Sequence, residues 1–184
     1  MSDTTSEHHP NLPVHLAALA EESETSQRQR QEFLGLGLAE ASYALPLSSI
    51  REIVKHTPTT AVPRAPSHIL GIISVRGRIT TVIDLRKRLK LPAPAATHST
   101  RILLVDNGHG EVLGLLVDRV LSVYRLHEEE IEYSAAVSGE LADYVTGIGR
   151  PSTTRGYSDR RNAQSNLDEE ELLILLDPTP LLKR

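Results

Sequence analysis

The feature of this sequence that most limits its fold is an internal repeat of short apolar runs. Residues 44–53 are followed seventy positions later by residues 114–123, and each apolar position of the first segment meets an aliphatic residue or a glycine in the second. Two later pairs of segments match in the same order: 71–72 with 147–148, and 82–85 with 175–178. A repeat of this kind predicts two similar subdomains related by a pseudo-two-fold axis.

The apolar runs have the length of β-strands. Runs such as 101–105, 112–117 and 172–176 are separated by turn residues, and Asp106-Asn-Gly-His-Gly is a hairpin signal between the first two. Asp84 is placed to cap a short helix over residues 85–90. We expect about five short strands in each half, the number that closes a small barrel. The predicted fold class is all-β: two small five-stranded SH3-like barrels in a pseudo-two-fold arrangement, with short helices.

The chain divides into a tail and a folded domain. Residues 1–32 hold six acidic residues and two arginines, so the net charge of −4 lies in this segment. We expect a disordered acidic tail there, because this polar and acidic segment cannot support a hydrophobic core. The folded domain takes residues 33–184, with one barrel at about 33–95 and the other at about 100–184. Residues 150–171 are polar and are predicted to form a flexible insert.

Composition argues against several classes of function. The absence of cysteine excludes disulfides and thiolate metal sites and fits a cytoplasmic protein. The part after residue 32 has no net charge and the chain is only 3% aromatic, which disfavours nucleic acid as a partner. No apolar run approaches the length that crosses a membrane. We therefore expect no nucleic-acid partner and no direct membrane insertion.

The sequence contains no pattern that is typical of a catalytic site. The glycines of residues 108–114 loosely resemble a phosphate loop, but they lie between two predicted strands, where a hairpin explains them. The histidines lack the spacing of a zinc helix, and no serine stands in a nucleophile-elbow context. The sequence predicts a protein that is not an enzyme, with no catalytic residue, metal ion or cofactor.

Residues 71–86 carry the most specific motif of the chain. They read Gly-Ile-Ile-Ser-Val-Arg-Gly-Arg-Ile-Thr-Thr-Val-Ile-Asp-Leu-Arg, which resembles the signature of the CheW-like coupling proteins of bacterial chemotaxis. That signature has glycine, an aliphatic pair, asparagine, an aliphatic residue, Arg-Gly and an alternating strand that ends in Asp-Leu-Arg. The resemblance continues in order over residues 33–182, through segments 43–46, 50–53, 63–66, 114–123, 145–148 and 175–177.

This resemblance implies a non-catalytic adaptor that couples chemoreceptors to a chemotaxis-type histidine kinase, in the cytoplasm and recruited to receptor arrays. The partners it implies are the regulatory domain of the kinase and the cytoplasmic hairpin tip of the receptors. The matching positions for partner contacts are Arg76, Glu52 and Ile50, with Val120 and Val123 in the second barrel. The structural alternatives are that Ile50, Val120 and Val123 belong to the core, and that Arg76 is a solvated turn residue.

The chain departs from the family pattern at three places. Ser74 stands where the family has asparagine, a proline usual near residues 133–134 is missing, and the insert 150–171 is long. Two other functions stay open at this point. One is a detached regulatory domain of a larger chemosensory signalling enzyme, and the other is a small β-barrel that binds nucleic acid.

Overall fold

The computed structural model of this chain describes residues 30–106, 108, 110–133, 141–152 and 171–183. Residues 1–29 and 153–170 lie outside the described residues. The predictions of a disordered tail and a flexible insert fall almost entirely on these segments and stay predictions. Residues Gln31–Arg184 form one compact unit.

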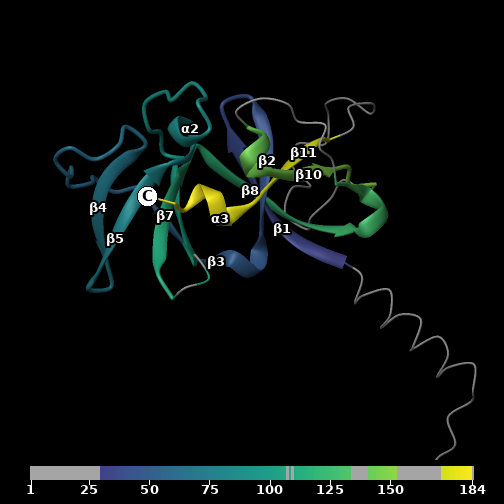
Figure 1. The fold of residues 1–184 in the computed structure, drawn as a ribbon, viewed down its shortest axis with the longest axis horizontal. Coiled ribbons are helices and arrows are strands. Elements are labelled where there is room, and N and C mark those ends of the chain that lie inside the picture. The colour runs from purple at the N-terminus through teal and green to yellow at the C-terminus, as the bar shows by residue number, and fades with distance from the viewer. Residues whose placement is uncertain (1–29, 107, 109, 134–140, 153–170, 184) are drawn as a thin grey trace, which may run out of the picture. The chain divides into compact units, whose positions relative to one another are not determined.

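Strands dominate the described residues, as Figure 1 shows, and the all-β prediction is confirmed. The elements run along the chain as β1 (Arg30–Leu38), β2 (Ala41–Pro46), η1 (Leu47–Ser49), β3 (Ile50–Lys55), β4 (Ile69–Val75), β5 (Arg78–Asp84), α2 (Leu85–Arg88), β6 (Arg101–Asp106), β7 (Val112–Val117), β8 (Arg119–His127), η2 (Glu128–Glu130), β9 (Ile131–Glu132), η3 (Ala142–Tyr144), β10 (Val145–Gly149), β11 (Leu173–Leu176) and α3 (Pro178–Leu181).

The strands form two sheets that each combine parts of both sequence halves. The first sheet has the order β8-β1-β2-β11-β10-β9, and the second has the order β3-β6-β7-β5-β4. Strand β3 leaves the β1–β2 hairpin and joins the second sheet, while β8 leaves the β6–β7 hairpin and joins the first. The predicted division into barrels at 33–95 and 100–184 therefore differs from the observed pairing. The reason is that β3 and β8 have the same apolar spacing, so either sheet could accept either strand.

The pseudo-two-fold repeat is visible in the strand register. In the first sheet β11 pairs with β2 in parallel and Leu175 lies opposite Ala44, while in the second β5 pairs with β7 in parallel and Val82 lies opposite Gly114. Each pair is the counterpart of the other under the sequence repeat. In each sheet the antiparallel neighbour of the parallel strand also has a register shift that is followed by a glycine. Gly147 of β10 lies opposite Leu175 of β11, and Gly71 of β4 lies opposite Val82 of β5.

Three apolar clusters hold the sheets together. One cluster belongs to each sheet alone, and a larger third cluster takes side chains from both. Strand β6 shows the division, since Ile102 and Leu104 enter the cluster of the second sheet while Leu103 and Val105 enter the shared cluster. Both faces of this strand are buried, which explains its uninterrupted apolar run.

The outer edges of the second sheet approach each other. Thr60, in the segment that follows β3, pairs with Ile72 of β4 through two backbone hydrogen bonds of 2.9 Å. Gly71 has a φ of +144°, and a Cβ atom there would lie 2.2 Å from the carbonyl oxygen of Thr60, so only glycine allows this approach. In the first sheet the same place is taken by β9, which pairs with β10 and adds a sixth strand to the five predicted. The SH3-like closure of each sheet stays a prediction.

A buried arginine joins the two sheets. Asp84 caps α2, as predicted, by accepting a hydrogen bond from the backbone nitrogen of Arg86. The guanidinium of Arg86 then binds the same carboxylate through Nε and Nη2, both at 2.9 Å. Its Nη1 donates to Asp118 Oδ1 at 2.6 Å and to the carbonyl oxygen of Pro94 at 2.9 Å. We call Asp84, Arg86 and Asp118 the Arg86 clasp.

The Arg86 clasp lies where the chain passes from one sheet to the other. Asp118 stands between β7 and β8, and its Oδ2 accepts a hydrogen bond of 2.8 Å from the nitrogen of Ala39 in the β1–β2 turn. The side chains of Arg86 and Asp84 are only 4% and 2% exposed, so their interaction is poorly screened by water. The hydrogen bonds to Asp84, followed by its charge and that of Asp118, raise the pKa of Arg86 against the opposing effect of burial.

Replacing Arg86 with methionine tests this clasp. The substitution keeps much of the side-chain volume but leaves the buried carboxylate of Asp84 without its partner, so we expect a loss of about 3–5 kcal/mol in the free energy of unfolding. Urea denaturation followed by circular dichroism measures it. Arg125→Gln is the matched control, because Arg125 pairs with Glu32 at 2.8 Å where both side chains are exposed, and its loss should stay below about 1 kcal/mol. Equal losses in the two variants would contradict a special role for Arg86.

Candidate partner-binding surface

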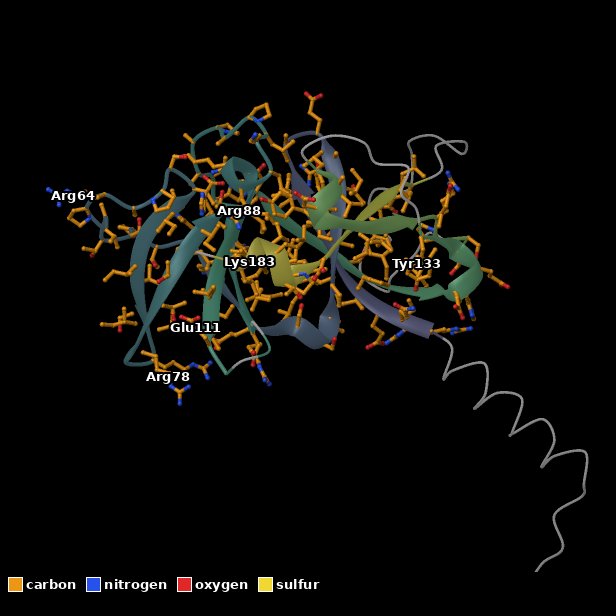
Figure 2. All side chains as sticks on the ribbon, in the orientation of Figure 1. Arg64, Arg78, Arg88, Glu111, Tyr133 and Lys183 are labelled. Carbon is orange, nitrogen blue, oxygen red and sulfur yellow. The ribbon has the colours of Figure 1, made fainter. Side chains whose placement is uncertain are left out.

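Arg76 lies at the tip of the β4–β5 hairpin. Its φ is +49° and that of Gly77 is +80°, which gives the two-residue turn that the Arg-Gly pair predicts. A side chain in this left-handed region costs about 1–2 kcal/mol, and glycine or asparagine would adopt it more readily. Since the backbone conformation does not favour arginine at residue 76, we infer that the arginine is present because of what its side chain contacts. Figure 2 shows the neighbouring Arg78 projecting away from the sheet at the same tip.

Glu52 on β3 is the partner of Arg76. Arg76 Nη2 lies 2.7 Å from Glu52 Oε1, and the two side chains are 80% and 32% exposed. Because β3 and β4 are the two ends of the strand order, this ion pair spans the edges of the second sheet. The structure thus brings together two of the predicted site residues that are 24 positions apart. The high exposure of Arg76 leaves most of its donors accessible to another molecule.

The predicted aliphatic site residues fall into two groups. Ile50 and Val120 are half-buried and pack against the shared apolar cluster, which supports the core alternative for both. Val123 is 38% exposed on β8. Its counterpart under the repeat is Ile53, which is 44% exposed on β3 and was not among the predicted site residues. Equivalent exposed aliphatic residues therefore lie on β3 and β8, the two strands that are exchanged between the sheets. The sequence repeat aligns Ile53 with Val123 and could have identified Ile53 as a site residue.

The corresponding edge of the first sheet carries different chemistry. There the hydroxyl of Tyr124 on β8 donates a hydrogen bond to Glu171, which precedes β11. Burial, followed by the hydrogen bond with Glu171, raises the pKa of Tyr124 to about 12. Tyr124 also covers Gly35 of β1, where a Cβ atom would lie 2.4 Å from the tyrosine ring. Here the first sheet thus has a partly buried hydrogen bond between a tyrosine and a carboxylate in place of the Arg76–Glu52 ion pair.

The departure at Ser74 concerns the same hairpin. Ser74 of β4 is exposed and pairs across the hairpin with Ile79 of β5, which is 75% exposed. The usual asparagine of the family would lie on this solvent-facing side, two residues before Arg76. The substitution therefore changes the surface beside Arg76 rather than the core.

The remaining basic residues of α2 form no charged stripe. Arg86 is buried in its clasp, and Arg88 contacts His68 Nε2 at 3.1 Å, the carbonyl oxygen of Pro180 at 2.8 Å and the ring of Tyr144. Burial, followed by the charge of Arg88, lowers the pKa of His68.

Within the described ranges no cluster of three or more acidic or histidine side chains could hold a metal ion, and no helix is long and apolar enough to cross a membrane.

Alanine substitutions separate the aliphatic residues by role. Ile50→Ala and Val120→Ala remove contacts with the shared cluster and should lower the free energy of unfolding by about 1–3 kcal/mol. Ile53→Ala and Val123→Ala, at equivalent exposed positions, should stay within about 0.5 kcal/mol of the parent protein. Urea denaturation compares the four variants. Losses of the same size at all four positions would show that Ile53 and Val123 belong to the core.

Comparisons with known proteins agree with this structure. Residues 32–184 match the family described as "CheW-like domain". The "Probable chemotaxis protein CheW" of Rhizobium etli is 32% identical over 119 residues, which are 64% of this chain and 76% of the relative. The "Chemotaxis protein CheW" of Bacillus subtilis is 42% identical over 90 residues, 49% of this chain and 57% of the relative.

A solved structure shows the same fold. The crystal structure of the scaffolding protein TtCheW from Thermoanaerobacter tengcongensis superimposes with a TM-score of 0.69 at 28% identity, over 84% of this chain and 94% of that protein. The family match covers both sheets, the Arg-Gly turn and the Arg86 clasp. The chain belongs to the CheW-like family.

Proposed function

We propose that this protein is a non-catalytic adaptor that couples chemoreceptors to a chemotaxis-type histidine kinase at receptor arrays. The observation that carries the proposal is the exposed Arg76–Glu52 ion pair on the second sheet of a CheW-like fold. Its relatives are named as chemotaxis proteins and, in one solved structure, as a scaffolding protein. The finer assignment is that the protein contacts the regulatory domain of the kinase and the cytoplasmic hairpin tip of the receptors.

The chemistry of the surface suits a protein partner. Glu52 holds the guanidinium of Arg76 through a single contact of 2.7 Å, so its other donors can bind a partner carboxylate. A preorganised arginine loses little conformational freedom on binding. Ile53 and Val123 add exposed aliphatic surface on the two exchanged strands, the kind of contact that an amphipathic receptor helix makes.

The experiment measures assembly of the purified protein with a chemotaxis histidine kinase and a soluble receptor fragment by size-exclusion chromatography and calorimetry. Arg76→Glu and Glu52→Arg should each weaken binding by about tenfold, the equivalent of about 1.4 kcal/mol. The double variant restores the internal pair with its charges exchanged, and we expect it to stay weak because the partner meets the wrong charge.

Arg150→Glu is the matched control, since Arg150 belongs to an exposed ion pair with Glu132 of β9, at the opposite end of the first sheet from β8. It should bind like the parent protein. Parental affinity in both single variants at Arg76 and Glu52 would remove these residues from the site. Failure of the parent protein to bind either kinase or receptor would refute the adaptor function itself.

A further inference from the structure

The guanidinium of Arg88 joins three elements that are far apart in the sequence. Its Nη2 donates a hydrogen bond of 2.8 Å to the carbonyl oxygen of Pro180 in α3, and its Cζ lies 5.6 Å from the centre of the Tyr144 ring in η3. Its Nη1 lies 3.1 Å from Nε2 of His68, in the turn that leads into β4. In Figure 2 Arg88 lies between α2 and α3. We call His68, Arg88 and the carbonyl group of Pro180 the α2–α3 junction.

The contact between Arg88 and His68 determines the protonation of the histidine. A guanidinium is always charged and has no acceptor, so Arg88 can only donate a hydrogen bond at this contact. Nε2 of His68 must therefore offer its lone pair, and the ring is neutral with its proton on Nδ1. A second proton, placed on Nε2, would remove the acceptor and leave two cations 3.1 Å apart.

The described residues form no ion pair that would balance a second positive charge at this junction, since none of their ion pairs includes His68 or Arg88. Asp84 contacts His68 through the backbone, where its nitrogen donates a hydrogen bond of 2.8 Å to the His68 carbonyl oxygen, and its carboxylate is already bound in the clasp. From η3 Tyr144 contributes its ring. Lys183, after α3, is a further cation. Protonation of the histidine therefore adds charge where cations already gather.

The bond to Pro180 connects the histidine with the shared apolar cluster. Leu181 and Leu182, at the end of α3, are both buried in that cluster. Arg88 binds a carbonyl oxygen in the last turn of this helix, where carbonyl groups lack partners within the helix. Displacement of Arg88 would leave this carbonyl group without its side-chain partner and loosen the end of α3.

We propose that His68 is a proton-sensitive switch: the neutral ring holds Arg88 on α3, and the protonated ring displaces Arg88 and loosens the end of α3. Burial and the charge of Arg88 lower the pKa of His68, so the folded protein takes up this proton at a lower pH than the unfolded chain, in which histidine titrates at about 6.5. The stabilising contact is therefore fully present above about pH 6.5 and is lost as the pH falls below that value.

The test is an NMR titration of the full-length protein, labelled with ¹⁵N, from about pH 7.5 to about pH 5, a range that spans the ordinary pKa of histidine. We expect the ring of His68 to titrate below about 6.5, and the backbone amides of Leu182 and Lys183 to shift with the same midpoint. The protection of the Leu182 amide against hydrogen exchange should fall about fivefold over this range. Amides of α3 that do not follow His68, or a His68 ring that titrates at or above the ordinary value, would overturn the proposal.

Two substitutions hold the switch in its two states. His68→Gln keeps an acceptor oxygen for Arg88 and cannot take up a proton, so the Leu182 amide should keep its protection over the whole range. His68→Lys carries the positive charge already at neutral pH and should lower this protection there by about fivefold. His98→Gln is the matched control, because the ring of His98 is exposed and contacts Ser99, and it should respond to acid like the parent protein.

An undiminished response to acid in His68→Gln would contradict the role of His68, whether or not His68→Lys folds. The proposed switch does not depend on the adaptor function. Because these measurements contain neither kinase nor receptor, their failure is distinguishable from failure of that function.

Discussion

The fold depends on one buried guanidinium placed at the crossing between its two sheets. Arg86 binds Asp84 from its own helix and Asp118 from the β7–β8 junction, and Asp118 in turn holds the β1–β2 turn through Ala39. The side chains of Arg86 and Asp84 are 4% and 2% exposed, so removal of the Arg86 charge would leave the carboxylate of Asp84 buried and unpaired. The clasp therefore fixes the point at which β8 leaves the second sheet for the first.

The exchanged strands connect this constraint to the surface. Strand β3 carries Glu52 and Ile53, strand β8 carries Val123, and each is an edge strand whose neighbour in the sheet comes from the other half of the chain, β6 for β3 and β1 for β8. The repeat is not symmetrical in its details, because among the described residues the other copy has no counterpart of the Arg86 clasp or of the Arg76–Glu52 ion pair. A protein built from two copies of one plan thus presents two different faces, which is a useful property for an adaptor with two kinds of partner.

Much of this architecture could be predicted from the sequence, because local rules determine it. The Arg76-Gly77 turn, the hairpin around Asp106 and the cap at Asp84 each follow from a few neighbouring residues. The exchange of β3 and β8 could not be predicted, since alternating aliphatic residues fit either sheet. The contact between Glu52 and Arg76 depends on that exchange, as does the distinction between half-buried Ile50 and exposed Ile53.

The most direct test of this account is hydrogen exchange of the backbone amides in the native protein at increasing denaturant. If the exchanged strands and the Arg86 clasp make the two sheets one cooperative unit, the slowest amides of β1 and β2 and those of β6 and β7 will open with the same free energy. Two separate opening energies, more than about 1 kcal/mol apart and divided between the two sheets, would contradict it.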